Sequence, residues 1–451
     1  MAFSVAGQHV VVVGAARSGI AAAALLVDRG ARVTLSERRD DLAEARSLAE
    51  RGIELELGGH RIDTFERADL VVLSPGVPPE QPAIEVARAR GVPVIAEIEL
   101  ASRWLKGRVI AITGTKGKST TTALTGRILE RAGFDVAVGG NIGAPLSEQV
   151  DRSTPSTLHV VETSSFQLEG IVNFHPWISV LLNVSPDHLD RHPNVDAYVA
   201  AKARIFENQQ QDDWAVVNAD DPIVLDLARK GRARVRLFAR RTPLESGTVI
   251  ESDWIVSREL QGSQRLVPLA AIHLLGPHLV SDVMAAATVG AIAGAHAEAT
   301  TAAVEAFRGL EHAMELVARS GGVRFVNDSK ATNVDSARHS IESFDEGLVP
   351  IIGGRFKGGD LGLLREPLRH RARAVVAIGE ARPLVRHALA DVVAVHDAES
   401  IDEAVKMAFE LARPSGVVLL APACASFDMF RDYADRGQKF KEAVRKLVGS
   451  G

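Results

Sequence analysis

The stretch that decides the fold of this chain reads Ile112-Thr113-Gly114-Thr115-Lys116-Gly117-Lys118-Ser119-Thr120. It follows an apolar run that is typical of a buried strand, and it opens a helical pattern over 119–131. A glycine-rich turn in this setting is typical of a phosphate-binding loop, because its backbone amides turn inward and the helix N-terminus adds partial positive charge. Ile112 stands where the full motif has its first glycine, so only the short form is present. We predict a nucleotide site with Lys118 on the phosphates and the Ser119 hydroxyl on Mg²⁺; the alternative is a glycine turn with an exposed lysine.

Outward from this loop, short runs rich in Val and Ile alternate with helical patterns along nearly the whole chain. The alternation predicts an α/β fold whose mainly parallel sheets are covered by helices on both faces. A break in the pattern over 248–272, with short alternating runs and turn residues, predicts antiparallel strands there. Changes in the pattern place three domains at 1–97, 98–309 and 310–451.

The composition excludes several classes of protein. With 46% hydrophobic and 24% charged residues over 451 positions, each domain can bury a core, which rules out global disorder. The net charge of −5 argues against a nucleic-acid coat and against a polybasic membrane binder. The longest uncharged apolar stretch, near 283–295, is too short for a membrane span, and the first ten residues lack the basic start of a signal peptide. We expect a cytoplasmic protein with no nucleic-acid or membrane partner.

A second glycine turn, Gly14-Ala15-Ala16-Arg17-Ser18-Gly19, follows the first predicted strand. It lies where a dinucleotide fingerprint would lie, but Ala16 replaces the middle glycine that lets a pyrophosphate approach. Glu37, at the end of the next strand, keeps the alternative of a nicotinamide-dependent oxidoreductase open. A tight packing turn between strand and helix accounts for the glycines equally well.

Further polar side chains follow strands in the second and third domains. Glu162 ends an apolar run, at the sheet edge where a carboxylate near a phosphate loop is a usual Mg²⁺ ligand. The loop 183–192 gathers Asp, His and Arg residues, while Lys202 has the pattern of a solvent-facing lysine. In the third domain three polar loops, 327–333, 353–358 and 421–428, follow three strands and would converge on one crevice suited to an anionic small molecule. Cys424, the only cysteine, reads as a small buried hydrophobe and excludes an internal disulfide.

Together these segments resemble the Mur ligase family, ATP-dependent enzymes that add amino acids to the peptidoglycan precursor. The resemblance covers essentially the whole chain, and the loops 327–333 and 422–428 place it nearest to the members that add D-glutamate. It implies a Rossmann-like N-terminal domain, a central phosphate-loop ATPase domain and a Rossmann-like C-terminal domain. It also implies that UDP-N-acetylmuramoyl-L-alanine is phosphorylated by ATP, with Mg²⁺, to an acyl phosphate that D-glutamate then attacks. We expect the enzyme to be a monomer.

The same resemblance assigns residues to each ligand. The UDP-sugar would be bound by Arg17, Ser18, Glu37, Arg38, Ser74, Pro75 and Gly76. ATP would be bound by Gly114, Thr115, Lys116, Gly117, Lys118, Ser119, Thr120, Asp282, Asp328 and Lys330. D-Glutamate would be bound by Thr332, Lys357, Ser426, Phe427 and Tyr433. Mg²⁺ would be held by Ser119, Glu162, His188 and a carbamylated Lys202. The residues implied in catalysis are Lys118, Asn141, His188 and Lys202.

The chain departs from the family pattern in two places. On the adenine side the family usually has a His-Asn pair followed by another Asn, where this chain has His278, Leu279 and Asp282. Asp282 can still accept from the adenine amino group, but Leu279 cannot. Ala313 stands where an arginine is usual. The rival interpretations are another Mur-type or folylpolyglutamate-type ligase, an NAD-dependent oxidoreductase, and a non-catalytic nucleotide-gated binding protein.

Overall fold

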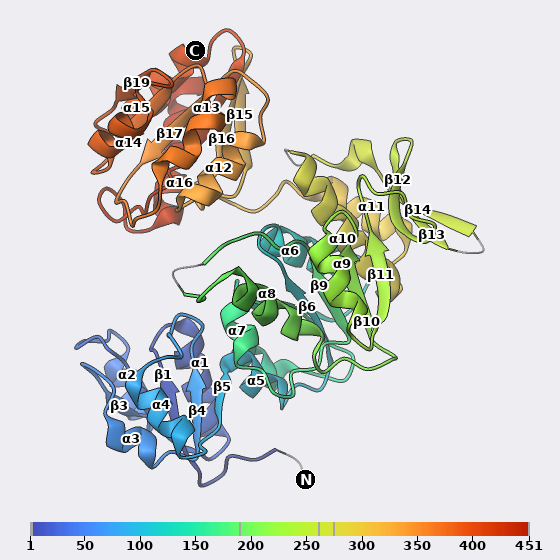
Figure 1. Ribbon diagram of the computed structural model, residues 1–451, viewed down its shortest axis with the longest axis vertical. Coiled ribbons are helices and arrows are strands. Elements are labelled where there is room, and N and C mark those ends of the chain that lie inside the picture. Colours follow the sequence, from blue (N-terminus) through green and yellow to red (C-terminus); the bar gives the residue numbers. More distant parts are fainter. Residues whose placement is uncertain (1–2, 189–190, 260–261, 274–275, 450–451) are drawn as a thin grey trace. The chain divides into compact units, whose positions relative to one another are not determined.

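The computed structural model describes residues 3–188, 191–259, 262–273 and 276–449, which form an α/β fold on three separate sheets (Figure 1). The chain divides into two compact units. The first comprises Met1–Ile272 and Val280–Ala306 and holds two sheets; the second comprises His273–Leu279 and Phe307–Gly451 and holds the third. All three sheets are mainly parallel, so the predicted fold class is confirmed.

The N-terminal sheet has five parallel strands in the order β3-β2-β1-β4-β5. They are β1 (His9–Val13), β2 (Arg32–Ser36), β3 (Glu54–Glu56), β4 (Leu70–Leu73) and β5 (Val94–Ala96). Alternate residues of β1 enter two different cores, Val10 and Val12 on one face and Val11 and Val13 on the other. A strand buried on both faces explains the unbroken valine run. The helices between the strands are α1 (Arg17–Asp28), α2 (Ala45–Glu50), α3 (Ile62–Glu66) and α4 (Pro82–Ala89).

The second sheet of the first unit has nine strands in the order β14-β13-β12-β11-β10-β9-β6-β8-β7. Strands β6 to β12 pair in parallel, and β12, β13 and β14 pair antiparallel, which confirms the prediction for 248–272. The strands are β6 (Arg108–Thr113), β7 (Val136–Gly140), β8 (Leu158–Glu162), β9 (Ile178–Leu181), β10 (Trp214–Asn218), β11 (Arg234–Phe238), β12 (Gly247–Glu251), β13 (Trp254–Glu259) and β14 (Gly262–Pro268). The helices are α5 (Glu97–Ser102), α6 (Lys118–Arg131), α7 (Ser165–Glu169), α8 (Val195–Ala203), α9 (Pro222–Arg229), α10 (Pro277–Ala293) and α11 (Ala297–Ala306), with the 3₁₀ segment η1 (Leu146–Arg152).

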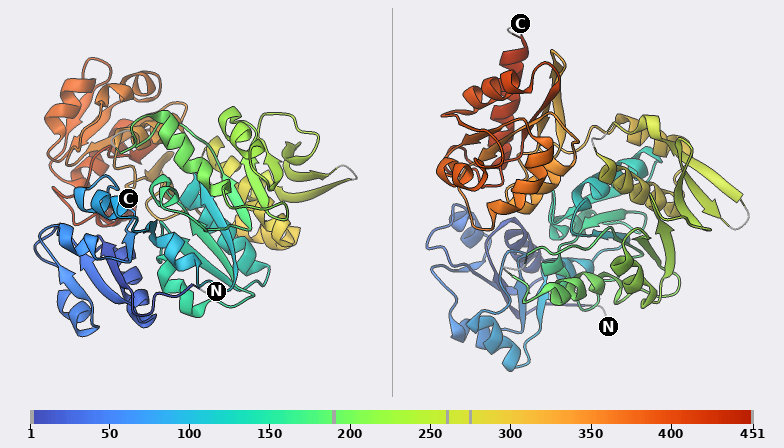
Figure 2. Two further views of the ribbon diagram at one scale, coloured as in Figure 1. Left: turned by 60° about the horizontal axis from the view of Figure 1, so that its bottom comes forward. Right: turned by 45° about the horizontal axis from the view of Figure 1, so that its top comes forward.

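The sheet of the second unit has six strands in the order β15-β16-β20-β17-β18-β19, and only the pair β15–β16 is antiparallel. The strands are β15 (Glu315–Ser320), β16 (Val323–Asn327), β17 (Leu348–Gly353), β18 (Val375–Ile378), β19 (Val395–Asp397) and β20 (Gly416–Leu420). Helices cover both faces (Figure 2). They are α12 (Val334–Glu342), α13 (Arg365–Arg371), α14 (Arg382–Leu389), α15 (Ile401–Ala412) and α16 (Tyr433–Gly449).

Strand order decides which loops meet. In the nine-stranded sheet β6 lies between β8 and β9, so the phosphate loop neighbours the residues that follow both strands. In the six-stranded sheet β20 lies between β16 and β17, which brings the loops 327–333, 353–358 and 421–428 to one edge, as predicted. In the N-terminal sheet β1 lies between β2 and β4. Each sheet therefore presents its polar loops at the carboxyl ends of its central strands, where ligands bind in open α/β sheets.

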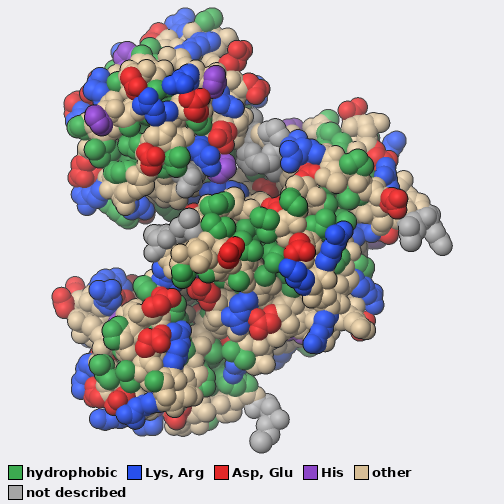
Figure 3. Space-filling view, viewed as in Figure 1, with side chains coloured by type: hydrophobic (Ala, Val, Ile, Leu, Met, Phe, Trp, Pro, Cys, Tyr) green, Lys and Arg blue, Asp and Glu red, His purple; other side chains and the backbone are tan. Residues whose placement is uncertain are grey.

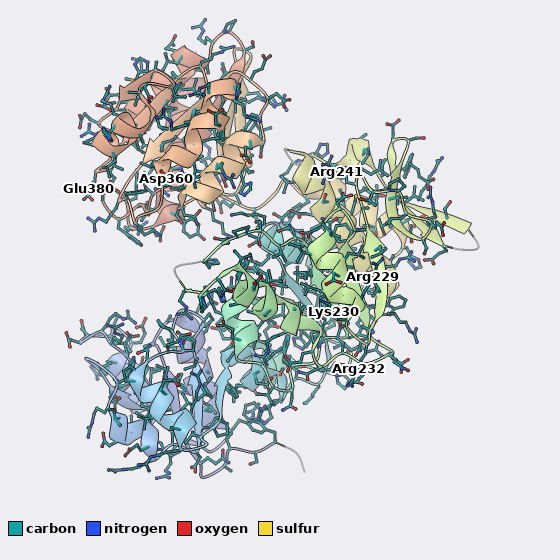
Figure 4. The ribbon with its side chains drawn as sticks, in the orientation of Figure 1. Arg229, Lys230, Arg232, Arg241, Asp360 and Glu380 are labelled. Carbon is teal, nitrogen blue, oxygen red and sulfur yellow. The ribbon has the colours of Figure 1, made fainter. Side chains whose placement is uncertain are left out.

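Acidic and basic side chains are interspersed on the face drawn in Figure 3. Exposed basic side chains lie around the end of α9 and after β11, namely Arg229, Lys230, Arg232 and Arg241 (Figure 4). Lys230 pairs with Asp226 at 2.6 Å, so this basic segment is partly neutralised. Among the residues that the structure describes, no helix has both the length and the apolar character needed to cross a membrane.

Candidate active site

The phosphate loop turns on two glycines with positive φ, Gly114 at +155° and Gly117 at +82°. A Cβ on Gly117 would lie 2.1 Å from Oδ1 of Asp282, so a larger residue there would be strained in its backbone and would displace the Asp282 side chain. Gly117 is the N-cap of α6. The Nζ of Lys118 donates to the carbonyl oxygens of Gly114 at 2.9 Å and Thr115 at 3.0 Å, so its side chain lies back across the loop.

The loop is held in shape by the residues after β9. Oδ1 of Asn183 accepts from the amides of Thr115 at 3.1 Å and Lys116 at 2.8 Å, and its Nδ2 donates to the Lys116 carbonyl at 3.1 Å. The Thr115 hydroxyl lies 3.0 Å from the Tyr198 hydroxyl and accepts from the Ser185 amide at 3.0 Å. Asn183 was not predicted as a functional residue; the only signal is that it directly follows a strand.

Glu162 supplies a buried carboxylate beside the loop. Its side chain is 2% exposed, and its Oε1 accepts from Nδ2 of Asn141 at 2.8 Å. The Asn141 amide also donates to the Glu162 carbonyl at 2.9 Å. Oε2 of Glu162 is buried and has no hydrogen-bond partner among the described residues. An unpartnered carboxylate oxygen in this position fits a divalent cation.

Unlike Glu162, two of the other predicted metal ligands, Ser119 and Lys202, are not carboxylates or imidazoles. Within the described ranges no three His, Cys, Asp or Glu side chains come together as a metal cluster. The predicted set therefore depends on the Ser119 hydroxyl and on a modified Lys202. Ser119 and Thr120 lie in the first turn of α6 and are half-buried.

Lys202 is buried against the phosphate loop. It is 2% exposed, its Nζ donates to the Gly114 carbonyl at 2.8 Å, and Nζ lies 4.8 Å from the centre of the Tyr198 ring. The expectation from pattern alone that Lys202 faces solvent is wrong, because α8 turns this face toward the end of β6. Burial lowers the pKa of Lys202 well below its ordinary value, and the charge of Lys118 lowers it further. Its amine is therefore disposed to be neutral, the form that reacts with CO₂.

The loop after β9 brings two histidines to this edge. His188 adopts a left-handed φ of +54°, is exposed, and packs edge-on against Phe166 with ring centres 5.1 Å apart. His192, which was not predicted as a site residue, is buried, and its Nε2 lies 2.9 Å from the Ser165 hydroxyl. It also stacks on Phe166. Leu189 and Asp190, in the same loop, lie outside the described residues.

Asp282 lies behind the phosphate loop. It is 4% exposed, and its Oδ2 has no hydrogen-bond partner within the part of the chain that the structure describes. Burial raises the pKa of Asp282 to about 8, with the Thr121 hydroxyl acting in the opposite direction. Leu279 is buried on the same helix, and the His278 side chain lies outside the described residues.

A cleft of about 1070 Å³ opens at the carboxyl ends of β1, β2 and β4. Five of the predicted UDP-sugar residues line it, namely Arg17, Glu37, Arg38, Ser74 and Gly76, whereas Ser18 and Pro75 are not in its lining. The Ser74 hydroxyl donates to the Gly14 carbonyl at 2.9 Å. Arg17 donates to the Gly143 carbonyl at 2.8 Å, which links the first glycine turn to the loop after β7.

The Glu37 carboxylate is hydrogen-bonded to the backbone of the first glycine turn. Its Oε2 accepts from the Ala15 amide at 2.7 Å, and Arg39 donates to it at 3.2 Å. Burial raises the pKa of Glu37, but the hydrogen bonds from Ala15 and Arg39 outweigh it and lower the pKa to about 2. A Cβ on Gly19 would lie 1.8 Å from the Gly14 carbonyl oxygen, so tight packing requires this glycine. Local packing and hydrogen bonding therefore account for Glu37 and for the glycines of this turn, the features that had favoured the oxidoreductase interpretation.

The edge of the six-stranded sheet carries the predicted amino-acid site. Lys330 and Lys357 are exposed, Thr332 is half-buried and Ser426 is buried. Phe427 and Tyr433 are large side chains left 62% and 42% exposed. Asp328 is buried; its Oδ1 accepts from the Met314 amide at 3.0 Å, and Ser340 donates to its Oδ2.

Arg436 is a buried residue beside this edge that the sequence did not indicate. Its fully buried guanidinium donates to the Ser329 hydroxyl and carbonyl, both at 2.9 Å, and to the Cys424 carbonyl at 3.0 Å. It therefore joins two loops of the site. Burial lowers its pKa to about 10. Cys424 is buried, as predicted, and burial raises the pKa of its thiol to about 12.

Three family models match successive parts of the chain. Residues 8–96 match "Mur ligase MurD-like, N-terminal domain", residues 112–290 match "Mur ligase middle domain", and residues 312–424 match "Mur ligase, glutamate ligase domain". The chain belongs to the Mur ligase family.

Curated relatives of this Mur ligase match along almost its whole length. Proteins of Koribacter versatilis and Geotalea daltonii are 45% and 44% identical over 98% of both chains. A protein of Acidobacterium capsulatum is 47% identical over 97% of this chain and 96% of its own. All three are named UDP-N-acetylmuramoylalanine--D-glutamate ligase.

Solved structures agree with this Mur ligase in fold at much lower identity. The MurF ligase of Thermotoga maritima in complex with ADP is 15% identical with a TM-score of 0.60. The match covers 99% of this chain and 96% of the MurF chain. The UDP-N-acetylmuramate-alanine ligase MurC of the same organism is 20% identical with a TM-score of 0.59, covering 98% and 100%. These similarities establish the fold alone.

Proposed function

We propose that this Mur ligase joins D-glutamate to UDP-N-acetylmuramoyl-L-alanine at the expense of ATP, in cytoplasmic synthesis of the peptidoglycan precursor. The observation that carries the proposal is the near full-length identity of 44–47% to relatives named for this reaction. The site geometry supports it, because the phosphate loop, the buried Glu162 and the buried Lys202 meet at one sheet edge. An oxidoreductase would leave all three without a role.

The three sheets suggest how the substrates are divided. We assign 1–97 to the UDP-sugar, with the cleft of about 1070 Å³ as its site. We assign 98–309 to ATP, and 310–451 to D-glutamate with a contribution to ATP from Asp328 and Lys330. The exposed rings of Phe427 and Tyr433 and the exposed Lys357 suit a small dicarboxylate, because lysine pairs with carboxylate and the rings cover the aliphatic part.

The chemistry requires a carboxylate to become an electrophile. The muramoyl-alanine carboxylate attacks the γ-phosphorus of ATP, ADP leaves, and the acyl phosphate forms. The amine of D-glutamate attacks the acyl carbon, and the tetrahedral intermediate loses phosphate and a proton to give the amide. The task of this chain is to position the groups and offset charge: Lys118 and the amides at the start of α6 face the transferring phosphoryl group.

The metal site is supported by the chemistry of its donors. Mg²⁺ supplies positive charge to the phosphate oxygens when bound. Glu162, oriented by Asn141, would hold it together with Ser119, His188 and Lys202. Lysine enters this set only as a carbamate: its neutral amine attacks CO₂, an N–C bond forms, and a proton leaves to water. The carbamate then offers oxygens where the ammonium offered none.

Phosphate release tests the proposal. Purified enzyme is given UDP-N-acetylmuramoyl-L-alanine, Mg²⁺ and ATP, with D-glutamate, L-glutamate, L-alanine or a diamino acid in turn. We expect release with D-glutamate alone, because a site that pairs both carboxylates leaves polar groups unpaired with the wrong hand. Equal turnover with L-alanine or a diamino acid would assign another step to the enzyme, and no release with any amino acid would refute the ligase activity. Gel filtration of the same preparation tests the expected monomer.

A further inference from the structure

Asp282 is a carboxyl group placed where a charge would be costly. It lies on α10, is 4% exposed, and its Oδ1 occupies the space beside Gly117 of the phosphate loop, 2.1 Å from where a Cβ on that glycine would lie. Its other oxygen, Oδ2, is buried with no hydrogen-bond partner among the described residues. A buried ionised carboxylate without a partner is strongly disfavoured, so the group takes up a proton instead.

Among the described residues, the N-terminus of α6 and the Thr121 hydroxyl are the features that would stabilise the ionised form. The helix α10 packs on α6, β12 and α11. Its Gly290 lies against Ile128 of α6 and Thr300 of α11, and its Thr288 hydroxyl donates to the Thr248 hydroxyl of β12. The charged residues on these three elements are Lys118, Arg127, Glu130, Arg131, Glu251, Glu298 and Glu305. Burial raises the pKa of Asp282 to about 8, and the nearby Thr121 hydroxyl acts in the opposite direction.

The position matters because of what the loop binds. Gly117 is the N-cap of α6, the point where the helix dipole and the free amides attract phosphate. Gly117 and Thr121 lie one turn apart on the face that meets Asp282, while Ser119 projects from the other side of the helix. Asp282 therefore reaches the loop from behind. A negative charge there competes with phosphate for the same helix terminus.

We propose that Asp282 is a positioning residue that supports the phosphate loop as a neutral acid, and that its ionisation weakens nucleotide binding in the alkaline range. This rests on the proposed nucleotide site. An acid in its neutral form can fill the space behind Gly117 as an amide would. Unlike an amide, it makes the loop's affinity for phosphate dependent on pH.

The direct test is the Kd of ADP, without metal, measured by calorimetry from about pH 7.5 to about pH 9.5, where the terminal phosphate of the nucleotide is almost fully ionised. We expect the wild-type Kd to rise by about tenfold over this range, from like-charge repulsion in a partly desolvated site. The Asp282→Asn variant should lose most of this rise, since the amide cannot ionise. Subtracting the two curves removes the contribution of every other group that titrates in this range. The exposed Asp226→Asn change on α9 is the matched control and should keep the wild-type slope.

A second arm uses the enzyme without nucleotide. The melting-temperature difference between Asp282→Asn and wild type should grow as pH rises from about 4 to about 8, because the unfolded acid ionises first. Thr121→Val removes the hydroxyl that favours the ionised form, so it should move the loss of ADP affinity to higher pH. Equal pH slopes for wild type and Asp282→Asn would overturn the inference. Absence of ADP binding at every pH would overturn the proposed nucleotide site, and the inference with it.

Discussion

Lys202 and Lys118 donate to the same acceptor, the carbonyl oxygen of Gly114, at 2.8 Å and 2.9 Å. Two ammonium groups on one oxygen repel each other, and the more deeply buried of the two gives up its charge more readily. Burial and the charge of Lys118 both lower the pKa of Lys202. This arrangement supports the proposed division of roles, in which Lys118 faces phosphate and Lys202, whose pKa is lowered, is the amine that CO₂ modifies.

Lys118→Ala should reduce phosphate release by at least about tenfold, because a charge-assisted hydrogen bond to phosphate contributes roughly 1.5–3 kcal/mol. The measurement is phosphate release at saturating substrates, together with the Kd of ADP. Lys230→Ala, an exposed lysine of the same unit, is the matched control. Wild-type turnover in Lys118→Ala would remove the loop from the mechanism.

Lys202→Ala should lose turnover and regain part of it when a short-chain carboxylate is added, since the carboxylate supplies the oxygens of the missing carbamate. The wild-type enzyme should also lose activity in CO₂-depleted buffer, which the variant should not. The activity of Lys202→Ala is measured against acetate concentration. A variant that is fully active without acetate would show that the lysine is structural only.

The fold was predictable wherever the signal is contiguous in sequence. The valine run of β1 and the strand, loop and helix at 109–131 carry their own periodicity, and they lie where the pattern put them. Short edge strands such as β3 and β19 were missed, because three residues cannot establish an alternation. The loops of the second unit were correctly predicted to converge, since strand ends of a parallel sheet share one edge.

The parts of the site that escaped prediction depend on tertiary pairing. Asn183 holds the phosphate loop only because β9 pairs with β6. Arg436 joins its two loops from a helix that begins 100 residues after Asn333, and no local pattern marks a buried arginine. Lys202 was misjudged by pattern because the Ala-rich α8 has no polar face to show which side is buried.

Arg436→Met should destabilise the second unit and impair use of D-glutamate. The change leaves the acceptors of Ser329 and Cys424 buried without donors, at about 1–3 kcal/mol for each unsatisfied group. We expect a lower urea midpoint and a raised KM for D-glutamate with a smaller effect on the KM for ATP. Arg436→Lys should recover little, since an ammonium cannot reproduce the planar fork. Arg431→Met, at a side chain that is 86% exposed, is the control; equal effects of the two methionine changes would refute the role.

Glu97→Gln should stabilise the first unit at alkaline pH. Glu97 is 1% exposed; its Oε1 accepts from the Ser147 amide at 2.7 Å, and its Oε2 has no partner among the described residues. Burial raises the pKa of Glu97 from 4.5 to about 7, Ser147 opposes this, and the charge of Glu148 adds to it.

The sign follows from the raised pKa. The neutral acid stabilises the folded state fully below the unfolded pKa, and this contribution is lost as pH rises through about 7. Glutamine has the same shape and does not titrate, so the gain in melting temperature of Glu97→Gln over wild type should be small near pH 4 and grow to a plateau above pH 7. The plateau corresponds to at most about 3 kcal/mol. Calorimetry from about pH 4 to about pH 8.5 measures it, with the exposed Glu130→Gln as the matched control. A difference that stays constant over this range would mean that Glu97 is ionised in the folded protein and compensated by a group other than Ser147.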